Sequence, residues 1–584
     1  MIKTLAKRIG EFKKATILTP ICMVGEVLME VIIPWMMALL IDNGVNGNGG
    51  AGNFNYILIT GGLLAVCCVL SLLAGFGGGK FGAIASTGFA RNLRRDMFHK
   101  VQEYSFSNID KFSTASLVTR LTSDVTRVQD AFQMLIRIAV RAPMTLLFSL
   151  FASFAINAEL SVIFVAAIPI LGVGLFLIMS KAHPVFERVF KRYDNLNSVV
   201  QENVSGMRVV KAFVREDHEI EKFKKVSKSI YDDFSYAEKV LAFNSPLMQL
   251  CVYAGMLLVA WLGAQLIVVD GTLKTGELMS VITYAMQVLM SLMMLSMIFV
   301  MLTMARASAE RICEVLNEES TLRNRADPIT EVPNGSIRFH NVSFAYREGG
   351  EFSLSDIDLE IKSGETVGII GGTGSSKSTL VQLIPRLYDV TEGSVEVGGR
   401  DVREYDLETL RNEVAMVLQK NVLFSGTIKE NLRWGNPDAT DEEIVHACRL
   451  AQADSFIENF PDRYDTYIEQ GGTNVSGGQK QRLCIARALL KKPKILILDD
   501  STSAVDTATD ALIRKAFREE IPDTTKLIIA QRISSVQDAD KIIVLDGGKV
   551  HGFGTHEELL SSNDIYREVY YSQQKGGEKN AETE

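Results

Sequence analysis

Two adjacent carboxylates, Asp499 and Asp500, follow an apolar run at 495–498 and precede a polar turn. Such a run is typical of a buried parallel strand, and α/β sheets bind ligands at the carboxyl ends of these strands. One acid is enough to orient a metal ion, which leaves the role of the second carboxylate open. The pair therefore indicates a reactive site at the edge of a sheet.

A second chemical signal is the segment ETVGIIGGTGSSKSTL at 365–380, which changes from strand to glycine-rich loop to helix. Such a loop turns backbone N–H groups toward phosphate oxygens, and the helix adds its positive end. Lys377 is expected to reach the β- and γ-phosphates, and the Ser378 hydroxyl to lie on Mg²⁺. The loop comprises Gly371, Gly372, Thr373, Gly374, Ser375, Ser376, Lys377, Ser378 and Thr379.

This loop departs from the usual spacing G-x-x-x-x-G-K-[ST], because Ser376 stands where the second glycine belongs. Serine is small enough to fit where bulkier residues would not. We therefore expect nucleotide binding to be retained with altered strength.

The elements that must hold these residues follow from the second half of the chain. From Ser336 onward, short β-rich runs alternate with helical stretches, which predicts a parallel-sheet α/β domain. We place a nucleotide-binding domain at 336–575, a linker at 311–335 and a disordered tail at 576–584.

The first half is predicted to be an all-α membrane domain over 1–310. Its six apolar stretches lie near the length of about 20 residues that crosses a bilayer, at 16–41, 56–79, 134–157, 161–181, 241–269 and 278–303. Lys and Arg concentrate at the N-terminus and in 90–130 and 182–225, whereas the loop at 41–53 has none. This asymmetry predicts a multi-pass cell-membrane protein with both termini in the cytoplasm.

Composition excludes other classes. The net charge of −8, without blocks of Lys or Arg with interleaved aromatic residues, predicts no nucleic-acid partner. The seven cysteines show no C-x-x-C pair, which is typical of membrane or reduced cytosolic thiols.

Three further motifs carry a family resemblance: LQKNVLFSGTIKENL at 418–432, NVSGGQKQR at 474–482 and ILILDDSTSAVD at 495–506. Together with the phosphate loop, they closely resemble the nucleotide-binding domain of ABC transporters, in that family's order. The six spans resemble one half of a type I ABC exporter, so the resemblance covers almost the whole chain.

The resemblance implies the site residues and their ligands, ATP and Mg²⁺. Tyr346 would stack on adenine, and Gln419 would join Ser378 and Asp499 at the metal. The signature residues would cover the γ-phosphate of ATP on the opposite subunit: Ser476, Gly477, Gly478 and Gln479.

Coupling residues are implied in the same way. Asp506 would close the loop between the two sites, and Glu469 would be a coupling carboxylate. The segments around 112–125 and 213–217 would couple motion into the membrane.

Two positions differ from the family pattern. Asp500 stands where the family usually has the glutamate base, and Gln531 stands where it has the switch histidine. Aspartate is one methylene shorter, and a misplacement of about 1 Å can cost roughly 100-fold in rate. Glutamine bonds a phosphate but cannot share charge as imidazole does. We therefore expect a weakly hydrolytic site and an obligate heterodimer whose partner, a homologous subunit, completes the competent site.

Two features of the membrane half concern the cargo, which is the compound to be exported. Seven methionines form one stripe along the sixth span: Met279, Met286, Met290, Met293, Met297, Met301 and Met304. The stripe could meet apolar cargo or pack against neighbouring helices. Glu26 and Glu30 lie four apart in the first span, where charge is costly. They could meet cationic cargo or pair with Arg137 or Arg141.

These inferences favour a subunit of an ATP-driven exporter of small amphipathic or hydrophobic compounds. Lipid or peptide cargo stays open, as does a homodimer with slow ATPase. From another class, an ATP-gated regulatory or channel-like protein also stays open.

Overall fold

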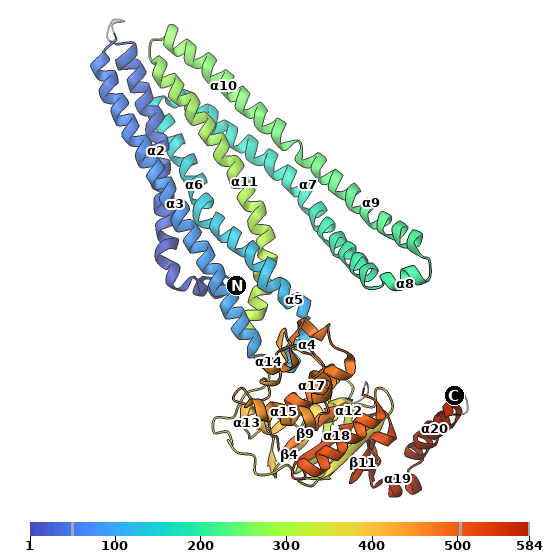
Figure 1. Cartoon of the computed structure of the whole chain (residues 1–584). Helices are drawn as coiled ribbons and strands as arrows, with labels where there is room; N and C mark the ends of the chain where they lie inside the picture. The colour runs from blue at the N-terminus through green and yellow to red at the C-terminus, as the bar shows by residue number, and fades with distance from the viewer. Residues whose placement is uncertain (48–51, 348, 501–504, 582–584) are drawn as a thin grey trace. The chain divides into compact units, whose positions relative to one another are not determined.

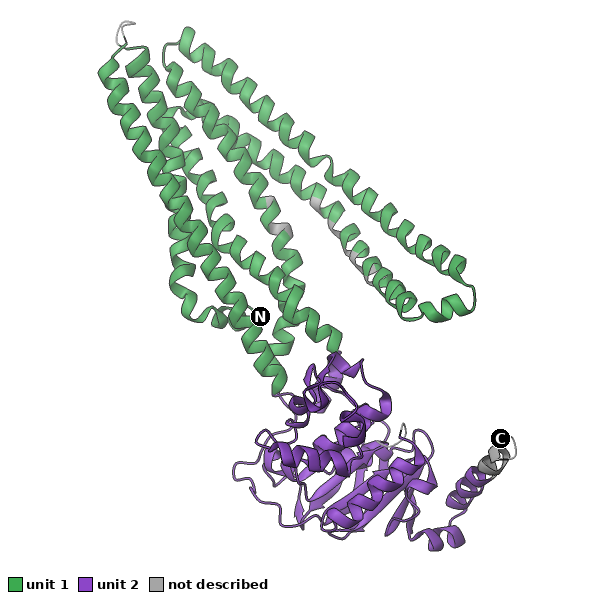
Figure 2. Cartoon of the chain, in the orientation of Figure 1, with its two compact units in different colours: residues 1–102, 114–318 green, residues 103–113, 319–584 purple. Residues whose placement is uncertain are grey.

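The computed structural model describes residues 1–47, 52–347, 349–500 and 505–581 and has two compact units (Figures 1 and 2). Unit 1 comprises Met1–Gln102 and Thr114–Glu318, and unit 2 comprises Glu103–Ser113 and Glu319–Glu584. A short insert of the helical half therefore belongs to the unit that contains the sheets.

Unit 1 is built from long helices. Within its described residues, six helical segments are long and apolar enough to cross a membrane: Ile2–Val45, Phe54–Gln102, Thr114–Ile156, Ala158–Phe186, Glu216–Val268 and Thr275–Leu295. Each overlaps one of the six predicted spans. The individual helices are α1 (Ile2–Ala6), η1 (Lys7–Phe12), α2 (Lys13–Leu39), η2 (Leu40–Val45), α3 (Phe54–Gln102), α5 (Thr114–Thr119), η3 (Arg120–Asp124), α6 (Val125–Ile156), α7 (Ala158–Ser205), α8 (Met207–Ala212), α9 (Glu216–Leu241), α10 (Asn244–Val268) and α11 (Thr275–Asn317).

Helix α2 shows how the sequence directs this packing. It buries every fourth residue from Ala15 to Val31, while apolar side chains such as Ile17 and Ile21 stay exposed. Residues four apart share one face of a helix, so that face contacts neighbouring helices. The exposed apolar face suits a lipid environment, in which a helix satisfies its own backbone hydrogen bonds.

Unit 2 contains a six-stranded sheet in the order β12-β11-β3-β10-β9-β6 and a four-stranded sheet in the order β2-β1-β4-β5. A two-stranded sheet pairs β7 with β8. The strands are β1 (Ile337–Phe344), β2 (Leu354–Ile361), β3 (Thr366–Gly371), β4 (Glu392–Val397), β5 (Arg400–Asp401), β6 (Val414–Val417), β7 (Gly426–Thr427), β8 (Tyr467–Ile468), β9 (Ile495–Asp499), β10 (Thr525–Ile529), β11 (Lys541–Asp546) and β12 (Lys549–Gly554).

The helices of unit 2 connect and cover these strands. They are α4 (Phe106–Lys111), α12 (Lys377–Gln382), α13 (Leu407–Glu413), α14 (Ile428–Leu432), α15 (Asp441–Leu450), α16 (Asp454–Ile457), η4 (Arg463–Asp465), η5 (Gln470–Gly472), α17 (Gly477–Leu489), α18 (Thr507–Glu520), η6 (Ile533–Ser535), α19 (His556–Ser562) and α20 (Asp564–Ala581). Helix α20 covers 576–581 of the stretch predicted as a tail, and 582–584 lie outside the described residues.

Strand β9 is buried on both faces. Leu496 and Leu498 join one apolar cluster with residues of α15 and α17, whereas Ile495 and Ile497 join a second cluster with β1, β2 and β4. A strand that is buried on both sides reads as a continuous apolar run, which explains this segment of the sequence.

Strand register brings the expected site together. β10 lies between β3 and β9, parallel to both, and Ile529 pairs with Ile369 on one side and Asp499 on the other. The carboxyl ends of these strands therefore meet at one edge. That edge carries the glycine-rich loop after β3, the acids at the end of β9 and Gln531 after β10.

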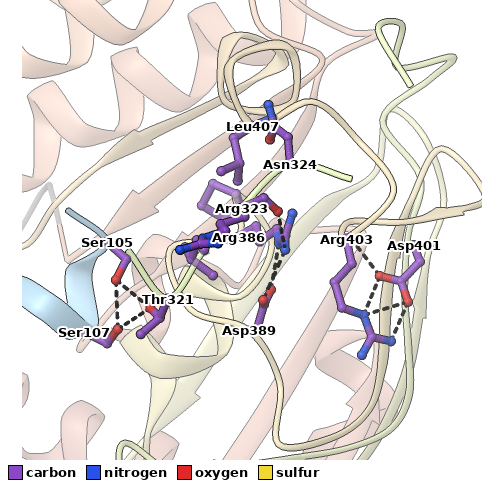
Figure 3. A network of polar contacts seen from close by, with 12 residues as sticks. Ser105, Ser107, Thr321, Arg323, Asn324, Arg386, Asp389, Asp401, Arg403 and Leu407 are labelled. Atoms are coloured by element: carbon purple, nitrogen blue, oxygen red, sulfur yellow. Dashed lines mark hydrogen bonds and ion pairs between the residues drawn. The ribbon is translucent and has the colours of Figure 1, made fainter. Parts of the chain in front are cut away.

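The insert of unit 2 is the short helix α4. Ser105 caps it, because its hydroxyl accepts from the Asn108 backbone and the Asn108 side chain accepts from the Ser105 backbone. Ser105 and Ser107 each lie 2.7 Å from the Thr321 hydroxyl (Figure 3). Of the segment 112–125 that is predicted to couple motion into the membrane, Phe112 and Ser113 belong to unit 2 and the residues from Thr114 onward belong to unit 1. The coupling role of this segment stays a prediction.

Candidate functional site

The glycine-rich loop joins β3 to α12 and is tightly packed. A Cβ atom at Gly371 would overlap the carbonyl oxygen of Leu545 in β11, so only glycine fits there. The Lys377 ammonium donates to the carbonyl oxygens of Gly371 and Gly372, both at 2.8 Å. Burial lowers the pKa of Lys377, while the charges of Asp500 and Asp499 oppose that effect. The lysine therefore lies inside the loop, between its carbonyls and the two acids.

Ser376 adopts a backbone conformation that favours glycine. Its φ is 68°, in the left-handed region, and it directly precedes α12. A non-glycine residue there is strained by about 1 kcal/mol or more. The departure seen in the sequence thus has a structural consequence: serine fits, but at an energetic cost.

Ser378 and Asp499 lie together at the start of α12 and the end of β9. The Ser378 hydroxyl donates to Asp499 Oδ1 at 2.9 Å. Asp499 is almost fully buried, and burial raises its pKa, with the Asp500 charge adding to the effect and the Ser378 hydrogen bond and Lys377 opposing it. Adjacent hydroxyl and carboxylate oxygens are the ligands that Mg²⁺ takes in proteins, so the pair fits that ion.

The two positions that depart from the family pattern contact each other. Gln531 Nε2 donates to Asp500 Oδ2 at 2.7 Å. Asp500 has a φ of 49°, and its own N–H donates to the Ile529 carbonyl at 3.2 Å. A cavity of about 110 Å³ opens beside both side chains. The short acid is thus buried and engaged by the amide that stands in place of a histidine.

An aromatic group extends from the loop to α4. The hydroxyls of Tyr346 and Thr379 are 2.9 Å apart, and the Tyr346 and Tyr388 rings meet edge to face with centroids at 5.3 Å. The Tyr388 hydroxyl donates to Asp110 Oδ2 on α4 at 2.6 Å. The residue expected to stack on adenine is therefore connected, through one tyrosine, to the insert.

The signature begins a helix. Ser476 is the N-cap of α17, its hydroxyl accepting from Gln479 N at 3.3 Å and its N–H donating to Gln479 Oε1 at 2.9 Å. Gly477 and Gly478 form the first turn, which leaves backbone N–H groups exposed at the positive end of a 13-residue helix. This arrangement suits contact with an anion.

Comparisons with known proteins decide the family. Residues 16–292 match the model of the ABC transporter transmembrane region, and residues 354–503 match the ABC transporter model. The chain is 37% identical, over 95% of each chain, to "Uncharacterized ABC transporter ATP-binding protein YfiB" of Bacillus subtilis. The chain belongs to the ABC transporter family. The predicted fold class, a helical transmembrane domain followed by an α/β ATPase domain, is confirmed.

Two further relatives carry functional names. This ABC transporter is 33% identical to the "ATP-dependent lipid A-core flippase" of Desulfotalea psychrophila, over 83% of this chain and 84% of that protein. It is 29% identical to the "Putative multidrug export ATP-binding/permease protein YgaD" of Bacillus subtilis, over 98% of this chain and 99% of that protein. The transporter is therefore an ABC exporter half with membrane and ATPase domains.

Other predicted residues of the transporter stay predictions. Gln419 lies in the exposed segment between β6 and β7, and its place at the metal is an expectation. Asp506 is the N-cap of α18 and accepts from Thr509 N at 2.9 Å, which lowers its pKa. Glu469 Oε2 accepts from the Thr473 hydroxyl at 2.6 Å, just before the signature.

Sequence reasoning missed Asp110 and Tyr388. The signal for the helix that carries Asp110 was the pair Ser105 and Asn108, spaced as a capping box. Tyr388 gave no local signal, because its partner lies 278 residues away.

In the membrane unit of the transporter, Arg141 of α6 pairs with both acids of α2. Its guanidinium lies 3.2 Å from Glu26 Oε1 and 2.5 Å from Glu30 Oε1. Of the two pairings weighed, Arg141 rather than Arg137 therefore meets the acids. Within the described residues, Glu26 Oε2 is buried without a hydrogen-bond partner.

The methionine stripe of α11 is mostly exposed in the single chain, as at Met279, Met290 and Met297. Met301 instead packs against an apolar cluster with Met134 and Ile298. Cargo contact and helix packing both stay open for the stripe.

Proposed function

We propose that this chain is one subunit of a heterodimeric ATP-driven exporter of small amphipathic compounds, with both termini in the cytoplasm. Its own phosphate loop, with Ser378 and Asp499 as Mg²⁺ ligands, binds ATP but hydrolyses it slowly. Its signature completes the faster site on a homologous partner. When bound, ATP would supply the phosphoryl group that is transferred to water, and Mg²⁺ would supply the positive charge that orients this group.

The hydrogen bond between Gln531 and Asp500 carries this proposal. A general base must reach within about 3 Å of the water it activates. Asp500 is one methylene shorter than glutamate, and one of its two oxygens is already engaged by Gln531 at 2.7 Å. Both changes withdraw the carboxylate from the position of the water, at a cost of roughly 100-fold or more in rate.

Heterodimer formation explains why both changes persist in one chain. A composite site takes its phosphate loop from one subunit and its signature from the other. The capped signature of α17 is intact. An impaired loop side and an intact signature side together fit a subunit that serves a competent partner.

The test is ATP turnover by the full-length chain, purified alone and with any homologous chain that co-purifies. We compare wild type with Asp500→Glu, Gln531→His and the double variant. The cavity beside both residues gives the added methylene room. The double variant is expected to raise turnover of the chain alone by roughly 100-fold. Because the two side chains contact each other, their effects should not be additive.

The control is Lys377→Ala, which should abolish the gain. Full cargo-stimulated turnover by wild-type chain purified alone would contradict the proposal and favour the homodimer. ATP-dependent accumulation of dye in inverted vesicles separates a transporter from a gated channel, which cannot concentrate its solute.

A second candidate cargo is lipid. The relative named as a lipid A-core flippase favours it. Reconstituted protein that moves a fluorescent phospholipid between leaflets, but accumulates no soluble dye, would establish this candidate instead.

A further inference from the structure

The last helix, α20, contacts the turn η6 that follows the switch position Gln531. Tyr566 anchors it: this side chain is fully buried, and its hydroxyl shares a hydrogen bond with His556 Nδ1 at 2.7 Å. Tyr566 lies in the same apolar cluster as Ile533 and Val536, which belong to the switch segment. The base of α20 is therefore fixed against the segment that carries Gln531.

Two turns beyond Tyr566, Gln573 contacts the backbone of that segment. Its Oε1 accepts from the Ile533 N–H at 2.9 Å, and its Nε2 donates to the Gln531 carbonyl at 2.9 Å. A primary amide supplies a donor and an acceptor at once, so one side chain holds two peptide groups on either side of Arg532. Fixing these groups fixes the direction in which Gln531 projects.

Gln531 in turn holds Asp500, through the 2.7 Å hydrogen bond described above. We propose that Gln573 is a positioning residue of the ATP site, which sets the placement of Asp500 through the backbone and side chain of Gln531. Among the described residues, the side-chain hydrogen bonds of Gln573 go to Gln531 and Ile533, and not to the phosphate loop or to Asp499 and Asp500. The inference goes beyond the proposed function, because it holds whether this site is slow or fast.

The first experiment is hydrogen–deuterium exchange of the full-length protein in detergent, read on peptides. The variant is Gln573→Met, which keeps the length of the side chain and loses the amide. Exchange in a peptide covering 530–536 is expected to be roughly 2- to 10-fold faster, as for loss of a hydrogen bond. Exchange in 541–554, which covers β11 and β12, should stay unchanged.

The matched control is Gln574→Met. Gln574 is the next residue, and its amide donates to the Tyr570 hydroxyl at 2.6 Å within α20. The same change there should leave both peptides as in wild type. Gln573→Asn, which keeps the amide on a shorter stem, is the second variant should the methionine disturb folding. It is expected to give the same local increase.

The second experiment measures kcat and KM for ATP. Gln573→Met is expected to raise kcat roughly 2- to 10-fold with KM unchanged, because a less firmly held Gln531 releases the Asp500 oxygen that it engages, while the phosphate loop is untouched. In a Gln531→Ala background the same change should have no further effect, since residues that act through one another are not additive.

The proposal is overturned by either of two results. One is exchange in 530–536 that matches wild type, or that rises equally in 541–554. The other is a kcat effect of the same size with and without Gln531. Neither result depends on whether Asp500→Glu restores turnover, so failure of the proposed function would be seen separately.

Discussion

At the residue scale, the ATP site contains two non-glycine residues with left-handed backbones, Ser376 at a φ of 68° and Asp500 at 49°. This conformation costs about 1–2 kcal/mol for most residues, although aspartate tolerates it better than most. Strain of this kind is held in place by its surroundings: Asp500 by Gln531 and Ile529, and Ser376 by the helix it precedes. Both residues adjoin groups expected to bind phosphate or metal.

Relief of the strain at Ser376 gives a first prediction. Ser376→Gly should raise the stability of the ATPase domain and tighten ATP binding, by about 1 kcal/mol in total, because glycine adopts a positive φ freely. Isothermal titration with a non-hydrolysable ATP analogue measures the change in binding, and thermal unfolding measures the change in stability. Ser376→Ala keeps the strain and should give no gain. An equal gain in both variants would show that the serine hydroxyl, and not the backbone, is responsible.

Asp499 gives a prediction of pH dependence. Burial raises its pKa, so the folded chain holds this proton more tightly than the unfolded chain does. The stabilisation from the protonated acid is therefore complete below the unfolded pKa and is lost as pH rises through the folded pKa. Asp499→Asn keeps an acceptor for Ser378 and removes the buried charge.

We therefore expect Asp499→Asn to melt at a higher temperature than wild type at pH 7, while the two converge as pH falls. Thermal unfolding of the nucleotide-free protein across this range measures the difference. Mg²⁺-dependent ATP turnover should be lost in the variant. A variant that is less stable than wild type at pH 7 would show that Asp499 is stabilised, not penalised, in its charged form.

At the scale of elements, α4 is held on the sheet unit by the bond from Tyr388 to Asp110. A hydrogen bond to a carboxylate contributes about 1.5–3 kcal/mol, more than a neutral one. Asp110→Asn should therefore weaken cargo stimulation of ATP turnover, while turnover without cargo stays within about twofold of wild type. Both rates are measured on reconstituted protein.

Tyr388→Phe removes the hydroxyl but retains the ring contacts with Phe106 and Tyr346. It should reproduce the effect of Asp110→Asn, and the double variant should be no worse than either single variant. Additive losses would mean that the two residues act separately.

The elements differ in how far the sequence predicts them. The contact between Ser378 and Asp499 follows from two local motifs and a parallel sheet, whose strand ends must meet. The contact between Asp110 and Tyr388 spans 278 residues, and α4 is a short polar helix with one capping signal. The pairing of Gln531 with Asp500 also escaped prediction, because the sequence shows both departures but not that one side chain meets the other.

At the scale of the whole molecule, Glu26, Glu30 and Arg141 form one ion-paired group in the membrane unit, and this group has an excess of negative charge if all three are ionised. An ionised side chain inside a bilayer costs a few kcal/mol, so it is expected to have a partner or a function. Arg141 forms ion pairs with Glu30 and with one carboxylate oxygen of Glu26. Among the described residues the other oxygen, Glu26 Oε2, has no hydrogen-bond partner.

A cationic group on the cargo could pair with this free oxygen of the Glu26 carboxylate. Glu26→Gln should therefore reduce transport of a cationic dye roughly 10-fold, as for loss of a charged partner worth 1.4 kcal/mol or more, and leave a neutral dye of similar size unchanged. Glu30→Gln is the comparison: Glu30 makes the shorter contact with Arg141, at 2.5 Å, so its loss should destabilise the membrane unit and lower transport of both dyes alike. Equal transport losses for the two dyes in Glu26→Gln would make its carboxylate a structural partner of Arg141, with no part in recognising charge.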